Sequence, residues 1–79
     1  MKVTVHVTLR PGVLDVQGKA VEAALHGLGW PGAGNVRVGK VIEMDIDGAD
    51  AASAKETVEA MCAKLLANPV IEGYRVEIA

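Results

Sequence analysis

The side chains best suited to nucleophilic, acid-base or metal chemistry in this 79-residue chain are His6, His26 and Cys62. A metal site needs several ligands brought together at suitable spacing, and these three residues do not show a ligand spacing. Cys62 lies between Met61 and Leu65 in an apolar pattern with helical spacing, which predicts a buried and unreactive thiol. We therefore predict no catalytic residue, no metal site and no cofactor bound by this chain.

Two further fragments resemble ligand-binding motifs only in part. The acidic run from Asp45 to Asp50 is similar to the start of a calcium loop, but the remaining ligands and the final bidentate Glu are missing. Four glycines between positions 27 and 34 follow a predicted helix, whereas a phosphate cradle leads from a strand into a helix. We interpret the first as a solvated turn and the second as a flexible loop.

A third group consists of polar residues close to predicted loops. Solubility and local capping explain each of them individually, but as a set they could contact a partner protein. These residues are Arg10, Gln17, Arg37, Lys40 and Asn68.

The first half of the chain predicts a strand followed by a helix. Residues 2–9 alternate between apolar and polar types, which indicates a strand with one buried face and His6 on the other face. Arg10, Pro11 and Gly12 interrupt it, and Asp15 can cap the following helix. That helix ends at Gly29, and we expect Glu22 and His26 to face outward into solvent. Its five apolar positions at helical spacing are Ala20, Val21, Ala24, Leu25 and Leu28. Residues 30–34 form a loop.

Residues 35–47 form the least regular pattern. Val36, Val38 and the apolar residues at 42, 44 and 46 share one parity. A two-residue hairpin turn at Gly39-Lys40 would place Val36 opposite Glu43, so a single long strand, kinked or bulged at Gly39, fits better. Such a strand would extend beyond a small sheet and leave backbone groups unpaired unless a second chain covers them. We therefore expect dimerisation through shared strands.

The second half predicts another helix and a final strand. The helix begins at Asp50 or at the capping-box pattern of residues 53–56, and Asn68-Pro69 ends it. Its apolar stripe consists of Ala54, Val58, Met61, Cys62 and Leu65. In the last segment Tyr74, Val76 and Ile78 alternate with charged residues, as expected for a strand.

The element order predicts a single domain of residues 1–79 in the α+β class. We expect a two-layer β-α-β-α-β fold related to ferredoxin, with a mainly antiparallel sheet, a long kinked middle strand and two helices on one face. If Gly39 splits the middle strand, the order becomes βαββαβ, the ferredoxin-like order. A chain of this size buries only about 60% of its unfolded surface. Without Phe, and with one Trp and one Tyr, its core benefits from a partner chain.

Charge and cysteine content restrict the class of partner. The formal net charge is −2, and basic and acidic residues are interspersed, which argues against nucleic-acid or membrane binding. The alternating N-terminus is unlike a signal peptide or a membrane span. With one cysteine there is no internal disulfide, and we expect a cytoplasmic protein.

Four segments together carry a family resemblance, namely Val13–Val21, Ala24–Gly29, Val36–Lys40 and Met61–Arg75. Over nearly the whole chain they resemble the PurS family, the small subunits of phosphoribosylformylglycinamidine (FGAM) synthase. The chain departs from the family at Val16, where Pro is common, and in the loop of residues 30–34, which is rich in Gly and Pro.

The resemblance implies a non-catalytic assembly subunit in de novo purine biosynthesis. It would form a homodimer or tetramer and connect a glutaminase subunit, PurQ, with a large synthetase subunit, PurL, which uses ATP and magnesium. Ammonia released by PurQ would pass to PurL without escaping. The partner-binding residues we expect are Arg10, Asp15, Gln17, Gly18, Arg37, Gly39, Lys40, Asn68 and Tyr74.

Two other classes of function remain open from the residues. One is a small dimeric ferredoxin-like regulatory module that binds a small ligand. The other is a small enzyme with His6 or His26 as general base.

Overall fold

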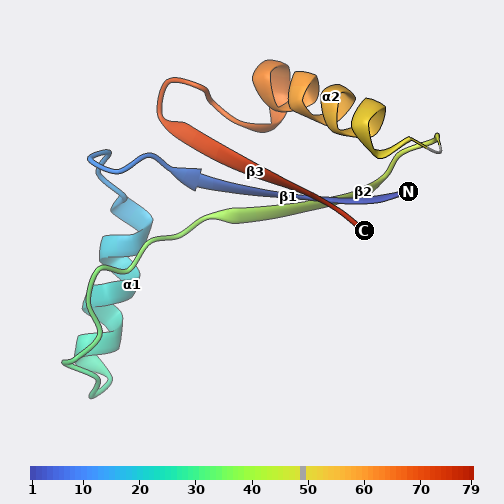
Figure 1. Ribbon diagram of the computed structural model, residues 1–79. Helices are drawn as coiled ribbons and strands as arrows, with labels where there is room; N and C mark the ends of the chain where they lie inside the picture. Colours follow the sequence, from blue (N-terminus) through green and yellow to red (C-terminus); the bar gives the residue numbers. More distant parts are fainter. Residues whose placement is uncertain (49) are drawn as a thin grey trace.

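The computed structural model describes residues 1–48 and 50–79 and contains a three-stranded antiparallel sheet with the order β2-β1-β3. The strands are β1 (Lys2–Leu9), β2 (Lys40–Asp45) and β3 (Glu72–Ile78). The helices are α1 (Val16–Gly27) and α2 (Ala51–Met61), and a π-helical turn, η1 (Cys62–Leu66), continues α2. Figure 1 shows this arrangement. The predicted α+β class, element order and antiparallel sheet are confirmed.

The core lies between the sheet and α2. Val3, Val5 and Val7 of the central strand are almost completely buried, together with Val58 and Cys62 from the helical segment. Val5 lies opposite Ile42 on β2 and Val76 on β3, and both partners also pack on this core. The alternation of residues 2–9 therefore correctly predicted which face of β1 is buried.

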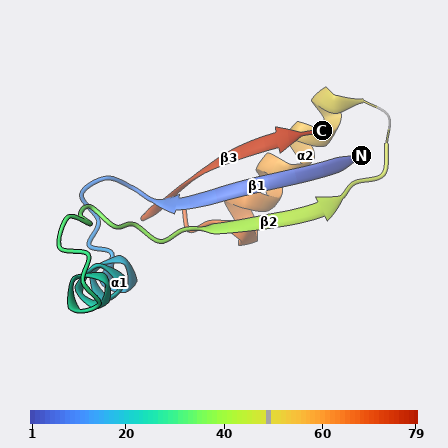
Figure 2. The same ribbon diagram turned by 90° about the horizontal axis from the view of Figure 1, so that it is seen from below.

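Helix α2 begins at the first of the two predicted positions. Asp50 is its N-cap, and its side chain accepts hydrogen bonds from Ala52 N and Ser53 Oγ. These two bonds satisfy groups at the start of the same helix. Figure 2 shows α2 behind the three strands, so its buried side faces the sheet.

The π-helical turn changes the end of the predicted apolar stripe. Ala67 N donates to Cys62 O over five residues, so this turn contains one more residue than an α-helical turn. As a result Leu66 packs against the core, while Leu65 is 82% exposed. The prediction that Leu65 belongs to the buried stripe was therefore wrong.

Helix α1 does not lie where the sequence placed it. We predicted both helices on one face of the sheet, but Figures 1 and 2 show α1 beyond the end of the strands, with residues 30–39 returning beside it. We call residues 16–39 the arm. Because of the arm, the radius of gyration is 15.9 Å, compared with about 12 Å for a compact chain of this length. The apolar side of α1 is small, since two of its five predicted positions are alanines.

Strand β2, the second strand in chain order, is also shorter than predicted. Its ladder begins at Lys40, opposite Val7, and ends at Asp45. A Cβ atom on Gly39 would lie 2.6 Å from Val7 O, so the chain passes very close to β1 where it joins the sheet. Residues 36–38 instead lie beside α1, and the middle segment is interrupted at Gly39.

Candidate functional site

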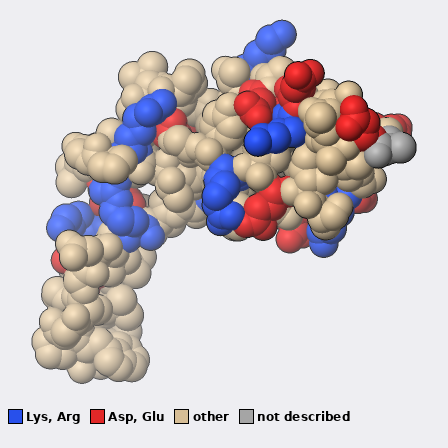
Figure 3. Space-filling model, viewed as in Figure 1, with Lys and Arg blue, Asp and Glu red and all other residues tan. Residues whose placement is uncertain are grey.

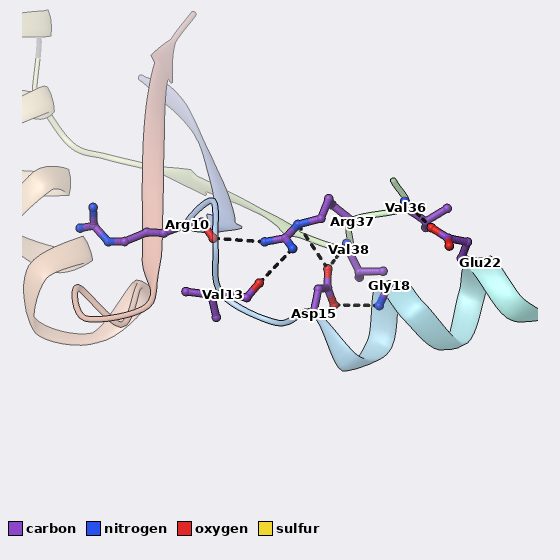
Figure 4. Close-up of polar contacts among 8 residues, drawn as sticks. All are labelled: Arg10, Val13, Asp15, Gly18, Glu22, Val36, Arg37 and Val38. Atoms are coloured by element: carbon purple, nitrogen blue, oxygen red, sulfur yellow. Dashed lines mark hydrogen bonds and ion pairs between the residues drawn. The ribbon is translucent and has the colours of Figure 1, made fainter. Parts of the chain in front are cut away.

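The base of the arm contains a network of polar contacts, which Figure 4 shows in close-up. Here the chain leaves β1, enters α1 and later returns toward β2. We call this network the joint, and its residues are Arg10, Val13, Asp15, Gly18, Arg37 and Val38.

Asp15 is the central residue of the joint. It is the N-cap of α1 and only 4% exposed. Its Oδ1 accepts a hydrogen bond from Gly18 N at 2.7 Å, and its Oδ2 accepts one from Val38 N at 2.7 Å. One carboxylate therefore caps the helix and also binds the returning segment, 23 residues further along the chain.

Arg37 connects the arm to the end of β1. Its Nη1 donates to Val13 O at 2.9 Å and its Nη2 donates to Arg10 O at 3.2 Å, while its Nε lies 4.0 Å from Asp15 Oδ2. Arg10 is itself attached to the body of the protein, because Arg10 N donates to Ile71 O and its guanidinium donates to Pro69 O. A planar guanidinium suits this role because its donors point in fixed, different directions.

A second carboxylate binds the returning segment further out along the arm. Glu22 Oε1 accepts from Val36 N at 3.1 Å. Asp15 and Glu22 are seven residues apart, about two turns of helix, so they face the same side. Val36 and Val38 are two residues apart, so in an extended segment their N–H groups point the same way. The two carboxylates thus take the place of a neighbouring strand for these two N–H groups.

Gly18 allows this close approach. A Cβ atom at position 18 would lie 2.4 Å from Val36 O and 2.7 Å from Asp15 Oδ2. Any side chain there would push the returning segment away from α1.

The hydrogen bonds keep both carboxylates ionised. The N–H of Val38, then that of Gly18, and the Arg37 charge lower the pKa of Asp15, although burial acts in the opposite direction. The pKa of Glu22 is lowered chiefly by the N–H of Val36, again against burial, with help from Lys19 and His26. Both groups are therefore charged acceptors at neutral pH.

Two shallow hollows flank the joint. One, of about 390 Å³, is lined by aliphatic residues of β1, α1 and the returning segment, with the side chains of Gln17, Lys40 and Glu72 among them. The other, of about 500 Å³, includes Thr8, Pro11 and Arg37. Mainly aliphatic surfaces with a few polar groups suit contact with a protein segment.

The structure brings most of the predicted partner-binding residues to this region. Five belong to the joint or border it, two line the smaller hollow, and Asn68 lies in the turn whose Pro69 carbonyl binds Arg10. Tyr74 lies apart, on β3, in a hollow with Lys55 and Glu59. The residues in or beside the joint are Arg10, Asp15, Gly18, Arg37 and Gly39, and those lining the smaller hollow are Gln17 and Lys40. Partner contact at these residues stays a prediction.

Sequence reasoning missed the part played by Glu22. We expected it to face away into solvent, but its side chain is only 19% exposed and binds Val36 N. Its seven-residue spacing from the capping Asp15, opposite two alternating valines, is a signal that could have indicated the contact.

The three residues first considered for chemistry lie in separate places. His6 Nε2 is 3.3 Å from Glu77 Oε1 on the sheet face opposite α2. His26 donates to Ala33 O across the outer end of the arm. Cys62, the first residue of η1, is fully buried, and burial, helped by the charge of Glu59, raises the pKa of its thiol. Across residues 1–48 and 50–79, no three His, Cys, Asp or Glu side chains gather in a way that could hold a metal ion, and no helix is long and apolar enough to cross a membrane.

Comparison with known proteins assigns the family. The model of the PurS family, described as phosphoribosylformylglycinamidine (FGAM) synthase, matches residues 2–79. The chain belongs to the PurS family. The resemblance found in the sequence is confirmed, and with it the prediction of a subunit of this ligase in purine biosynthesis.

Individual relatives agree with this assignment. The PurS subunit of Synechocystis sp. is 49% identical over 94% of this chain and 74% of the relative. A Bacillus subtilis PurS structure is 47% identical, with a TM-score of 0.87 over 96% of this chain and 94% of its own. A chain in the structure of PurLQS from Thermotoga maritima is 32% identical, with a TM-score of 0.87 over 96% of this chain and 93% of its own.

Proposed function

We propose that this chain is a docking subunit of FGAM synthase, which connects a glutaminase subunit, PurQ, and a large synthetase subunit, PurL, and contributes no catalytic group. The observation that supports this most strongly is the arm, which extends beyond the sheet instead of packing on it (Figure 1). A related chain occurs in the PurLQS structure of Thermotoga maritima. A small-ligand regulatory module is not favoured by the family comparison.

The outer part of the arm has the composition of a protein contact surface. Residues 23–35 contain no Lys, Arg, Asp or Glu. Figure 3 shows this end of the arm without charged side chains on the visible face, whereas charges gather over the sheet and α2. Leu28 is 71% and Trp30 60% exposed. Large apolar side chains exposed together mark sites that a partner covers.

Ammonia transfer explains why a docking subunit is needed. Free ammonia in water is protonated and diluted, so its efficient use requires a sealed and pre-organised contact between the glutaminase and the synthetase. In this proposal PurL binds ATP and magnesium, the present chain binds no cofactor, and the complex works in the cytoplasm.

We further propose that the chain works as a homodimer or tetramer. The apolar positions of α1 lack the sheet contact that covers α2, and β2 and β3 are the two edges of the sheet. A second copy offers matching surfaces for both features. Sedimentation of the purified chain at micromolar concentration tests this, and a monomer throughout that range would contradict it.

Reconstitution with the two enzymes tests the docking role. The synthetase and glutaminase subunits are mixed with and without this chain, and amidine formation is measured first with glutamine and then with an ammonium salt as nitrogen source. We expect the chain to raise the glutamine-dependent rate strongly and to leave the ammonia-dependent rate nearly unchanged. Equal glutamine-dependent rates with and without the chain would show that the proposal is wrong.

A further inference from the structure

The joint has a different role from the surface around it. Both oxygens of Asp15 are occupied by N–H groups of the same chain, and the side chain is almost fully buried. A carboxylate in this state has little left to offer a partner protein. Its interactions instead determine how the arm leaves the sheet.

No residue of the arm belongs to the apolar core between the sheet and α2. Helix α1 lies beyond the end of the strands and away from α2 in both views (Figures 1 and 2). Two backbone connections, at residues 10–15 and 36–39, attach it to the sheet. Two loop connections leave the angle of the arm adjustable unless further bonds hold it, and side-chain hydrogen bonds of Asp15 and Arg37 join the two connections.

We propose that Asp15 and Arg37 are positioning residues, which fix the angle between the arm and the sheet at the value that the partner subunits require. The inference rests on the proposed docking function. Asp15 ties α1 to the returning segment, and Arg37 ties that segment to the carbonyl groups of Val13 and Arg10. The joint thereby couples the arm to the residues that follow β1.

The effect on function comes from pre-organisation. A flexible arm must lose conformational freedom when it docks, whereas an arm already held at the right angle loses little. Loosening the joint should therefore weaken assembly without changing the complex once it has formed. In the reconstituted reaction this means a higher concentration of chain for half-maximal activity, with the same maximal rate.

The variant Asp15→Asn tests the role of the carboxylate. Asn is as good an N-cap as Asp, so it can still bind Gly18 N. Its single carbonyl oxygen cannot point to Gly18 and Val38 together, and its NH₂ group is a donor that would oppose Val38 N–H. We expect the half-maximal concentration to rise about tenfold, which corresponds to the loss of one hydrogen bond to a charged group.

The matched control is Asp50→Asn. Asp50 is the N-cap of α2, but both of its acceptor bonds lie within the first turn of its own helix. We expect no change in the half-maximal concentration. Amide hydrogen exchange in the free chain adds a local readout: Val38 should lose protection in Asp15→Asn, while Val5 in the sheet keeps it.

The variant Arg37→Ala provides a second test should Asp15→Asn fail to fold. Arg37 is 44% exposed, and its removal leaves the core between sheet and α2 intact. It should raise the half-maximal concentration in the same way. Arg37→Lys should not restore the wild-type value, because one ammonium group cannot reproduce the fixed fork that reaches Val13 O and Arg10 O.

The outcomes separate the two proposals. If the wild-type chain activates and a folded Asp15→Asn or Arg37→Ala chain has the wild-type half-maximal concentration, the positioning role is overturned and the docking function stands. If the wild-type chain does not raise glutamine-dependent activity, both proposals are overturned. A raised half-maximal concentration with an unchanged maximal rate supports the positioning role.

Discussion

The two helices of this small protein are attached to the sheet by different forces. Helix α2 and the turn η1 are held by apolar packing, with Val58 and Cys62 fully buried against the central strand. The arm is held by hydrogen bonds and charges at the joint, where Asp15 and Arg37 bind backbone groups. Apolar packing makes α2 part of the folded core, whereas polar attachment leaves the apolar side of α1 free for another protein.

The two N-caps illustrate the same difference. Asp15 and Asp50 both precede a helix and both accept a bond from an N–H in its first turn. Asp50 is exposed and binds only its own helix, while Asp15 is buried and also binds Val38. Identical capping residues therefore serve a local role in one region and a long-range role in the other.

The largest expected effect comes from weakening the packing of α2. Val58→Ala removes two methyl groups from a fully buried position, so the free energy of unfolding should fall by about 2 kcal/mol. The matched control is Val16→Ala at the start of the arm, which is 72% exposed and should change stability by less than about 0.5 kcal/mol. Urea denaturation at one fixed protein concentration measures both. Equal losses would mean that the arm belongs to the core.

The next largest effect comes from a substitution that separates α1 from the returning segment of the arm. Gly18→Ala places a Cβ 2.4 Å from Val36 O, so α1 and the returning segment must separate, at a cost of about 1–3 kcal/mol. We expect the amides of Val36 and Val38 to lose protection against hydrogen exchange, while those of β1 keep it. Gly27→Ala in the same helix has nothing within 4 Å of its Cβ and should be neutral or slightly stabilising. Loss of protection throughout the sheet would contradict the separate attachment of the arm.

How far the sequence predicts this structure depends on how local each signal is. The alternation of β1 and the capping residue Asp15 act through near neighbours and were predicted correctly, and Asp50 was one of the two predicted starts of α2. The position of α1 was not, because an amphipathic helix looks the same in sequence whether its apolar side meets its own sheet or another chain. The contact of Glu22 with Val36 was missed for a related reason, since a carboxylate on the polar side of a helix normally faces water.

Acid should loosen the arm before it affects α2. The folded-state pKa values of Asp15 and Glu22 are lowered, so their stabilising contribution is present above the ordinary carboxyl pKa of about 4 and is lost as the pH falls through the lowered values. Amide signals of Val36 and Val38, followed by NMR from pH 7 downward, should change before that of Val58. The pKa of Glu77, on β3, is also lowered, chiefly by Arg75, but both side chains are exposed, so its protonation should change the stability of the sheet only slightly. Simultaneous loss of all these amide signals would show that the arm and α2 are not held separately.

Raising the pH should weaken the packing around Cys62 and leave the arm unaffected. Burial raises the pKa of the Cys62 thiol, so its contribution is fully present below the ordinary value of about 8.5 and is lost as the pH rises through the folded-state value. A buried thiolate at the start of η1 would lack the hydration that its charge requires. Thermal unfolding by circular dichroism should show a modest alkaline decline that Cys62→Ala removes, although this variant starts from a lower midpoint. Because the joint contains no thiol, Asp15→Asn should retain the decline. A decline of equal size in Cys62→Ala would show that the buried thiol is not its cause.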